Sequence, residues 1–525
     1  MRVVPPRPTS PPRTPLREVA ALLGVPVPQA ATAASPDVTG VTGVTGVTLD
    51  SRAVLPGDLY AALPGARAHG ADFAAAAARS GAVAVLTDDD GARRVRAAAV
   101  DLPTLVVPDP RGVLGHVAAA VYGTEPTPLR MVGITGTNGK TTTAYLVHSA
   151  LTALGRRPGL IGTVETRIGQ ERVESVRTTP EAPELHALLA VMAERGLDGC
   201  VMEVSSHALA QHRVDGAVYD VALFTNLSQD HLDFHGDMES YFAAKAMLFT
   251  PEHSRRAVVC VDDDWGRRLA TVATVPVQTL ATGGGADWVV HPDERDAAAF
   301  VLTGPDGVRL ALRSSLPGAF NVTNTAMAAA VLVALGEDPV AVGRAVLVDP
   351  HVPGRMERVL REGGGEQPLA VVDYAHTPDA IGAALRALRP DTRGRLVCVT
   401  GAGGDRDRDK RRAMGAAAAE VADLVVVTDD NPRSEDPAAI REAVLAGVQE
   451  VRAAGREVEV VVVGDRRCAI REAVAAVWDE GADATVAVVG KGHERGQDVG
   501  GVVHPFDDRD ELREALRLAA GAVTR

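Results

Sequence analysis

A glycine-rich segment carries the clearest chemistry in this sequence. It follows an apolar run at 131–134, typical of a buried strand, and reads Gly136-Thr137-Asn138-Gly139-Lys140-Thr141-Thr142. Glycines let backbone N–H groups approach phosphate oxygens, a lysine can reach the β- and γ-phosphates of ATP, and a threonine can ligate Mg²⁺. The strict phosphate-loop pattern is not met, because Ile134 stands where the first glycine belongs. An ordinary strand–helix turn is therefore the alternative interpretation.

Further residues of the same region could bind a metal ion. Glu203 ends a strand-like run at 199–204 and is either a Mg²⁺ ligand or a solvated carboxylate. His231 lies in a segment dense in histidine and aspartate at 226–236, whose composition by itself favours a polar loop over a metal site. Lys245 is the one cation of the apolar stretch 241–249. In one interpretation the aliphatic stem of Lys245 packs against apolar residues and its ammonium group stays in water. In the other the amine is buried, has a lowered pKa and is reactive.

Alternating strands and helices must position these groups. Ala-rich helical segments separate strand-like runs, which predicts an α/β protein with mainly parallel sheets. A linker is expected at 124–128 and a second doubly wound region from 351. We predict four parts: a disordered tail at 1–31, a small N-terminal α/β domain at 32–127, a central domain at 128–350, and a C-terminal Rossmann-like domain at 351–525. The last should contain strands near 369–373, 396–400, 424–428, 458–463 and 485–489.

Composition narrows the functional classes. The 525 residues carry a net charge of −14, which argues against a nucleic-acid partner, because phosphate neutralisation needs clustered Lys and Arg. The N-terminus is rich in proline and arginine without the apolar core of a secretory signal, and no stretch reaches the length of a membrane span. We expect a cytoplasmic protein that does not bind membranes. The four cysteines lack paired spacing and are expected to be buried free thiols.

Together these motifs resemble the Mur ligase family, the ATP-dependent amide-forming ligases of peptidoglycan precursor synthesis. The resemblance runs from about residue 47 to about residue 505. It implies a UDP-binding domain, a central ATPase domain and a C-terminal domain for the incoming amino acid, with ATP and Mg²⁺ as cofactors and a monomeric state. The chain is similar to members that add 2,6-diaminopimelate to the D-glutamyl γ-carboxylate of UDP-N-acetylmuramoyl-L-alanyl-D-glutamate through an acyl phosphate.

The resemblance also implies roles for individual residues. The groups expected to bind the UDP-linked substrate are Ser51, Arg52, His69, Thr178, Thr179, Ser205, Gln211 and Arg213. Those expected around ATP, besides the loop Gly136, Thr137, Asn138, Gly139, Lys140, Thr141 and Thr142, are Asn321, Asn324, Arg355 and Asp373. The expected metal ligands are Thr141, Glu203, His231 and Lys245, the last as a carbamate, because lysine itself has no acceptor. Lys140, Lys245 and His231 are the expected catalytic residues.

The acceptor amino acid is expected to bind in the C-terminal domain. The residues implied by the resemblance are Arg406, Asp430, Asn431, Pro432, Arg433, Gly490 and Glu494. Diaminopimelate has a second amino-acid head, whose carboxylate suits the planar guanidinium of Arg433. Lysine lacks that carboxylate and would leave the arginine unpaired. Without the resemblance, the residues 431–433 read as a turn at the end of a strand.

Three alternatives stay open at the level of sequence. The first is a ligase of the same family that adds L-lysine. The second is a folylpolyglutamate synthase-like ligase, against which the Asp50-Ser51-Arg52 segment argues. The third is a nucleotide-binding regulatory protein without chemistry, which predicts that a metal or acceptor group is missing. Neither the stereochemistry of the diaminopimelate nor the oligomeric state can be read from the residues.

Overall fold

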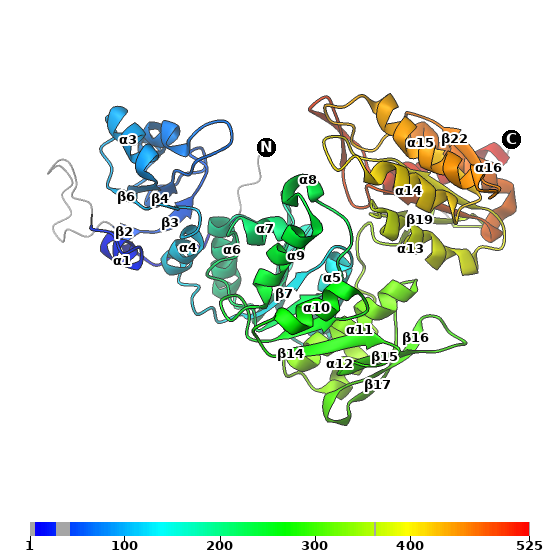
Figure 1. Ribbon diagram of the computed structural model, residues 1–525, viewed down its shortest axis with the longest axis horizontal. Helices are drawn as coiled ribbons and strands as arrows, with labels where there is room; N and C mark the ends of the chain where they lie inside the picture. The colour runs from blue at the N-terminus through cyan, green and yellow to red at the C-terminus, as the bar shows by residue number, and fades with distance from the viewer. Residues whose placement is uncertain (1–5, 28–42, 362–363, 524–525) are drawn as a thin grey trace.

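The chain forms three parts that follow one another in sequence, each built on its own sheet (Figure 1). The structure is a computed structural model that describes residues 6–27, 43–361 and 364–523. In the first part the strands are parallel and in chain order, β3-β4-β5-β6. Their bounds are Gly46–Thr48, Asp58–Ala61, Ala84–Thr87 and Thr104–Val106, and the helices are α2 (Ala74–Arg79), α3 (Asp89–Ala97) and α4 (Leu114–Tyr122).

The N-terminal segment corrects one expectation. We predicted a disordered tail over 1–31, but its described part is folded. Strand β1 (Thr14–Pro15) pairs with β2 (Gly43–Val44), and helix α1 (Leu16–Leu22) follows. Leu16, Val19 and Ala20 fall on one side of α1 and are buried in the core of the first part, so the prediction is wrong for this stretch. Residues 1–5 and 28–31 lie outside the described residues.

The central sheet positions the phosphate loop. Its order is β10-β9-β8-β11-β7-β12-β13-β14-β15-β16-β17, and the strands from β8 to β15 run parallel. The loop follows β7, which lies between β11 and β12, so residues that end these three strands meet at one edge. The bounds are β7 (Arg130–Thr135), β8 (Pro158–Ile161), β9 (Glu165–Ile168), β10 (Glu171–Glu174), β11 (Gly199–Glu203), β12 (Val221–Phe224), β13 (Ala257–Cys260), β14 (Val277–Thr282), β15 (Trp288–Pro292), β16 (Ala299–Thr303) and β17 (Arg309–Arg313).

Both outer edges of this sheet are antiparallel, which the sequence did not reveal. Strand β9 pairs antiparallel with both β8 and β10, while β15, β16 and β17 form an antiparallel meander. Strands β9, β16 and β17 alternate buried residues with more exposed ones. The expectation rested on continuous apolar runs, which mark strands covered on both faces and miss strands that are half exposed.

The C-terminal sheet confirms the expected strands. Its order is β18-β19-β23-β20-β21-β22, and all neighbours except β18 and β19 are parallel. The strands are β18 (Glu357–Arg358), β19 (Leu369–Asp373), β20 (Leu396–Thr400), β21 (Leu424–Val427), β22 (Glu459–Val462) and β23 (Thr485–Val489). The helices around them are α13 (Pro378–Leu388), α14 (Lys410–Ala419), α15 (Pro437–Ala453), α16 (Arg466–Val477) and α17 (Asp508–Val523). A hairpin of β24 (Gly496–Val499) and β25 (Val502–Pro505) extends from this part.

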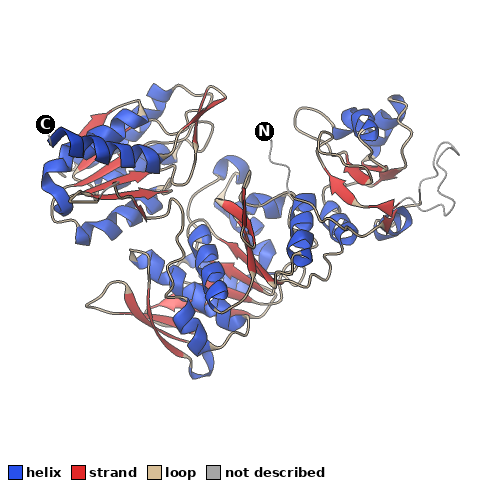
Figure 2. Cartoon of the chain, turned by 180° about the vertical axis from the view of Figure 1, so that it is seen from behind, coloured by secondary structure: helices blue, strands red, loops and turns tan. Residues whose placement is uncertain are grey.

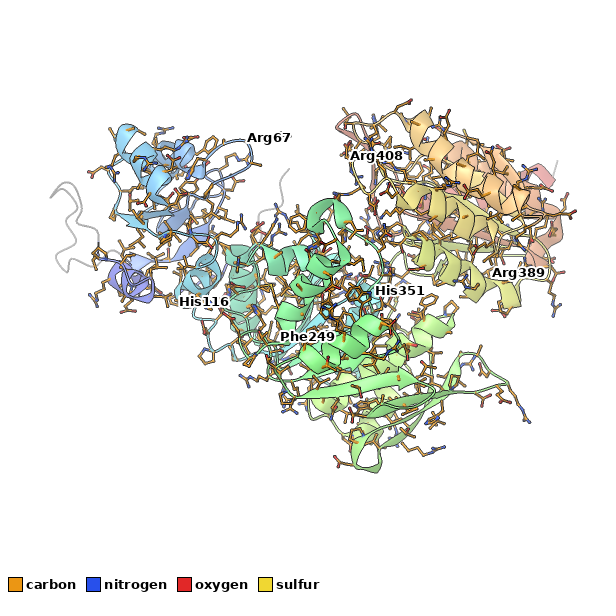
Figure 3. All side chains as sticks on the ribbon, in the orientation of Figure 1. Arg67, His116, Phe249, His351, Arg389 and Arg408 are labelled. Atoms are coloured by element: carbon orange, nitrogen blue, oxygen red, sulfur yellow. The ribbon has the colours of Figure 1, made fainter. Side chains whose placement is uncertain are left out.

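Helices cover both faces of the two larger sheets (Figure 2). In the central part α5 (Lys140–Ala153) and α11 (Ala319–Ala334) pack in one core, while α6 (Ala182–Glu194) and α9 (Met238–Ala246) pack in the other. Phe249 belongs to the second core and lies inside the central part (Figure 3). The α/β class with mainly parallel sheets is therefore confirmed. Within the described residues, no helix is long and apolar enough to cross a bilayer.

The cysteines agree with the sequence expectation in three of four cases. Cys200, Cys260 and Cys398 are buried free thiols, and burial raises the pKa of each to about 12. Cys468 is a free thiol as well, but it is exposed near the start of α16. The expectation of burial is wrong for Cys468, because it lies on the polar side of an amphipathic helix.

Candidate active site

The loop after β7 has the geometry of a phosphate cradle. Gly136 and Gly139 have φ values of 146° and 85°, a region that favours glycine. A Cβ on Gly136 would overlap the hydroxyl of Thr225. The backbone N–H of Asn138 donates to Asn226 Oδ1 at 2.9 Å, and that of Thr137 to the Asn226 carbonyl at 2.9 Å. The loop is therefore held in shape by the end of β12 and precedes the positive end of α5.

Lys140 begins α5 and folds back over the loop. Its Nζ donates to the carbonyl oxygens of Gly136 and Thr137, each at 2.8 Å. Burial lowers the pKa of Lys140, an effect that the carboxylates of Glu203 and Asp230 oppose. The ammonium group thus lies where the loop would hold phosphate oxygens.

Glu203 and Thr141 meet at the ends of neighbouring elements. The Glu203 side chain closes β11 and is 1% exposed, which excludes the solvated carboxylate. Thr141 Oγ1 donates to Glu203 Oε2 at 2.8 Å, and Thr163 donates to the same carboxylate from N at 2.7 Å and from Oγ1 at 3.0 Å. Arg355 Nη2, from the C-terminal part, lies 3.1 Å from Thr141 Oγ1. A buried carboxylate beside a hydroxyl supplies the hard oxygen ligands that Mg²⁺ prefers.

Lys245 is buried rather than extended into water. It lies on α9, its residue is 1% exposed, and its Nζ donates to the Gly136 carbonyl at 2.8 Å. The Nζ also lies 4.6 Å from the centre of the Tyr241 ring. Burial and the charge of Lys140 hold the pKa of Lys245 well below its ordinary value. The amine is therefore shifted toward its neutral, nucleophilic form.

The structure brings the expected metal ligands only partly together. His231 has a φ of 55° at the start of α8 (Leu232–His235), with its ring centre 4.9 Å from that of His207. Among the described residues, no group of three or more His, Cys, Asp and Glu side chains is arranged to hold a metal ion. Glu203 and Thr141 are adjacent, whereas His231 and Lys245 each have other partners. A carbamate on Lys245 would add a second carboxylate to this set.

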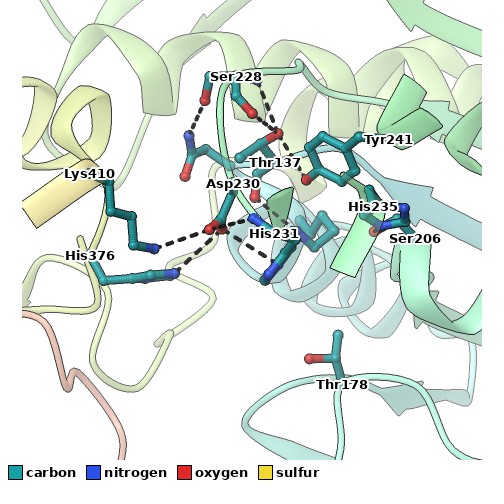
Figure 4. A network of polar contacts seen from close by, with 12 residues as sticks. Thr137, Thr178, Ser206, Ser228, Asp230, His231, His235, Tyr241, His376 and Lys410 are labelled. Carbon is teal, nitrogen blue, oxygen red and sulfur yellow. Dashed lines mark hydrogen bonds and ion pairs between the residues drawn. The ribbon is translucent and has the colours of Figure 1, made fainter. Parts of the chain in front are cut away.

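Asp230 joins the central part to the C-terminal part, which the sequence did not predict. Its carboxylate lies 3.1 Å from Lys410 Nζ and 3.7 Å from His376 Nε2 (Figure 4). Burial alone would raise the pKa of Asp230, but the neighbouring His376, His231 and Lys410 hold that pKa below its usual range. Asp230 stands in the polar segment noted in the sequence, whereas no pattern marked Lys410 as its partner.

The remaining ATP-side residues also approach the loop. Asn324 lies 3.4 Å from the Thr143 hydroxyl and donates to Asn321 Oδ1 at 3.0 Å. The Arg355 guanidinium lies 4.5 Å above the Tyr374 ring. Asp373 accepts hydrogen bonds from the backbone of residues 356 and 375, and burial raises its pKa. Asp373 therefore braces the turn that presents Arg355.

A second cluster lies at the carboxyl ends of the C-terminal strands. Asn431 Nδ2 donates to Glu494 Oε2 at 2.8 Å, and Arg433 Nη1 donates to the Gly404 carbonyl at 2.6 Å. Lys491 is fully buried and donates to both Asn431 and Glu494, although the sequence reasoning gave it no role. The remaining expected residues of this cluster lie close by: Asp430, Pro432, Gly490 and Arg406.

A large cavity lies between the first and central parts. Its volume is about 1170 Å³, and its wall includes Ser51, Arg52 and Gly70. Arg52 pairs with Asp50 at 2.7 Å and is 69% exposed, while the His69 ring is 3.1 Å from Asp88. The central part contributes residues of α6 and of the segments 173–177 and 180–181 to the wall.

The other residues expected at the UDP-linked substrate connect this cavity to Glu203. Thr179 Oγ1 donates to the Glu203 carbonyl at 2.9 Å and accepts from Ser205 N at 3.0 Å. The Thr178 hydroxyl lies 3.1 Å from that of Thr163. Arg213 lies 3.0 Å from Glu181 and donates to Gln211. These hydrogen bonds link the segment that follows the cavity wall to Glu203 at the end of β11.

Comparisons with known proteins agree with this arrangement. Three family models match: Mur ligase family, catalytic domain, at residues 43–122; Mur ligase middle domain, at 134–332; and Mur ligase, glutamate ligase domain, at 354–492. The chain is 54% identical to the UDP-N-acetylmuramoyl-L-alanyl-D-glutamate--2,6-diaminopimelate ligase of Streptomyces avermitilis, over 98% of this chain and 99% of the relative. A solved structure of a UDP-N-acetylmuramoyl-L-alanyl-D-glutamate--2,6-diaminopimelate ligase is 32% identical, with a TM-score of 0.64 and coverage of 97% and 99%. The chain shares its fold with folylpolyglutamate synthase of Mycobacterium tuberculosis. The two are 22% identical with a TM-score of 0.56, and the match covers 72% of this chain and 91% of the synthase.

Proposed function

This chain belongs to the Mur ligase family, and from that membership we propose that it is an ATP-dependent ligase that adds 2,6-diaminopimelate to UDP-N-acetylmuramoyl-L-alanyl-D-glutamate. The new amide forms at the D-glutamyl γ-carboxylate, a step of peptidoglycan precursor synthesis. The observation that carries the proposal is the cluster at the C-terminal strand ends, where Arg433, Asn431 and Glu494 form a polar site on the part that contacts the phosphate loop.

The chemistry begins with activation of a poor electrophile. A γ-carboxylate oxygen of the substrate attacks the γ-phosphorus of ATP, ADP leaves, and an acyl phosphate forms. The amine of diaminopimelate then attacks the acyl carbon, loses a proton, and expels inorganic phosphate. Lys140 and the backbone N–H groups of the loop would stabilise the charge on the transferring phosphoryl group. Arg355, which reaches Thr141 from the C-terminal part, would join them.

We place Mg²⁺ at Thr141 and Glu203, whose adjacent oxygens fit a hard cation. When bound, the ion would neutralise phosphate charge. We further propose that Lys245 carries a carbamate. Its neutral amine would attack CO₂, forming an N–C bond with release of one proton, and the resulting carboxylate would be a metal ligand beside His231. The burial of Lys245 and its lowered pKa support this modification.

The two substrates occupy different parts of the chain in this proposal. The UDP moiety binds in the cavity at Ser51, Arg52 and the loop of His69, and its peptide passes Thr178 and Thr179 to reach ATP. Diaminopimelate binds at the cluster around Arg433. Because ATP is the phosphoryl donor, we propose that the enzyme works in the cytoplasm. From its family membership we further propose that it is a monomer.

One assay tests the proposal against its nearest rivals. Phosphate release is measured with the UDP-linked dipeptide and, in turn, meso-diaminopimelate, LL-diaminopimelate and L-lysine. We expect release to require the UDP substrate together with a diaminopimelate, and the panel also identifies the stereoisomer. Preference for L-lysine would refute the assignment of the acceptor, and release with folate and glutamate instead would refute the reaction.

A variant of the phosphate loop provides the second test. Lys140→Ala should reduce turnover by about 10³-fold or more, because the charge on the transferring phosphoryl group loses its cation. Binding of the UDP-linked substrate, measured by calorimetry, should stay within two-fold of the native protein, since its cavity lies elsewhere. Native-like ligation by Lys140→Ala would refute the assigned role of the loop.

A further inference from the structure

The first described residues of the chain, 6–10, contact both the first part and the central part, and Pro6 and Arg7 line the large cavity between them. Arg7 Nη1 donates to the two carboxylate oxygens of Asp58, at 2.6 and 2.8 Å, and these side chains are 18% and 2% exposed. A few residues later, the backbone N–H groups of Thr9 and Ser10 donate to Glu194 at 3.0 and 3.1 Å. Asp58 begins β4 of the first part, whereas Glu194 ends α6 of the central part. The segment 6–10, hereafter the N-terminal strap, therefore ties the two parts together.

The strap also holds the loop that carries the expected uridine-side residues. Arg7 Nη2 approaches the Ala53 carbonyl at 3.4 Å, directly after Ser51 and Arg52 in the chain. Asp58 in turn accepts a hydrogen bond from Leu55 N at 2.8 Å. One guanidinium thus connects the middle of the segment between β3 and β4, at Ala53, to its C-terminal end, at Asp58. That segment has no helix or strand of its own in the structure, so its shape depends on such side-chain contacts.

The side chain of Arg7 is packed into the wall of the cavity. Pro6 and Arg7 are themselves part of the cavity wall, as are Ala187 and Leu188 of α6. Gly46, on β3, leaves space for the Arg7 side chain, because a Cβ at this position would lie 2.8 Å from Arg7 Nη1. Helices α4 and α6 pack against each other where the first and central parts meet (Figure 1). The strap crosses the same junction, with Pro6 and Arg7 at the large cavity and Ser10 and Glu194 at a second, smaller one.

We propose that the N-terminal strap is part of the site for the UDP-linked substrate, with Arg7 as a positioning residue for the loop of Ser51 and Arg52. This inference rests on the proposed function, since it takes the ligand of the cavity to be a nucleoside diphosphate. It adds to that function a segment that lies before the first family-model match, which begins at residue 43. Arg7 fixes the loop, and Thr9 and Ser10 fix the strap to α6, so the cavity has its binding shape before the substrate arrives.

The test uses the full chain with Arg7→Ala, Arg7→Lys and Glu194→Ala. The matched control is Arg17→Ala, which removes an exposed arginine of α1. Calorimetry without ATP gives the Kd of the UDP-linked dipeptide and of UDP alone, and steady-state assays give kcat and each KM. Thermal unfolding of every variant reports whether the fold is retained.

We expect Arg7→Ala to raise the Kd of the UDP-linked substrate about ten-fold, the loss of roughly one charge-assisted hydrogen bond. Arg7→Lys should lose less, because it retains the charge opposite Asp58. The KM values for ATP and diaminopimelate, and kcat at saturating substrate, should stay within two-fold of native values. Glu194→Ala should also raise the Kd, and the double variant should show less than the product of the single effects, because both changes release one strap.

Two results would overturn the inference. The first is an Arg7→Ala protein that binds the UDP-linked substrate within two-fold of the native Kd, or no more weakly than Arg17→Ala does. The second is a double variant whose effect equals the product of the single effects, which would mean that the two contacts act independently. Failure of the proposed function is a separate outcome: the native enzyme would then bind the UDP-linked substrate without ligating it.

Discussion

Replacement of Arg433 by alanine should remove selection for diaminopimelate while sparing the rest of the reaction. Arg433 lies in the loop after β21 with a φ of 51°, and one of its side-chain N–H groups already donates to the Gly404 carbonyl at 2.6 Å. A guanidinium has five N–H donors, so enough remain to bind a carboxylate through two hydrogen bonds. The remaining N–H groups of Arg433 would bind the second carboxylate of diaminopimelate, a group that L-lysine lacks.

The size of the effect follows from that geometry. Hydrogen bonds to a charged group contribute about 1.5–3 kcal/mol each, and the partial exposure of Arg433 favours the lower end. Two such bonds amount to about 3 kcal/mol, or roughly 100-fold in kcat/KM. Arg433→Lys retains the charge but loses the planar fork, so its loss should be smaller, about 10-fold.

The assay compares kcat/KM for diaminopimelate and L-lysine in the native enzyme, in both Arg433 variants and in Arg408→Ala. Arg408 is a suitable control because it is an exposed arginine of the same part, paired with Glu435 at 3.2 Å (Figure 3). We expect the value for L-lysine to change by less than about three-fold, since that substrate makes no contact with the fork. The reasoning is refuted if Arg433→Ala retains more than a third of the native kcat/KM for diaminopimelate, or if both substrates lose equally.

Two further predictions concern the centre of the site. Lys245→Ala should be inactive and regain activity with added short-chain carboxylates, which would replace a carbamate as metal ligand; an inactive variant that no carboxylate rescues would argue against that role. Lys410→Met should lower kcat/KM about ten-fold, because it removes one of the two side chains of the C-terminal part, Lys410 and His376, that pair with the buried Asp230. Since the folded pKa of Asp230 lies below the unfolded value of about 3.9, its ion pair contributes fully above that pH and is lost only as pH falls through the folded pKa. The ratio of native to variant kcat/KM should therefore be constant from about pH 6 to 9, and a ratio that falls across this range would contradict the ion pair.

Much of the fold could be predicted because its strands are covered on both faces. Continuous apolar runs such as 396–400 and 424–428 became β20 and β21 with nearly the same bounds. The antiparallel edges were missed for the opposite reason, since half-exposed strands alternate polar and apolar residues. Helix α1 was missed because neighbouring prolines and arginines outweighed three apolar residues, which are stable only against the core of the first part.

The sequence by itself determined which chemical groups are available and the order in which the strands present them. The loop at 136–142 needs glycine at two left-handed positions, a local requirement that its letters already express. The tertiary structure alone decided which of these groups meet. It buried Lys245 against Gly136, joined Asp230 to Lys410 over 180 residues of chain, and placed Arg7 on Asp58 beside the cavity. These contacts depend on how elements that are distant in the chain pack against one another. The burial that lowers the pKa of Lys245, and the charged neighbours that lower the pKa of Asp230, exist only after that packing.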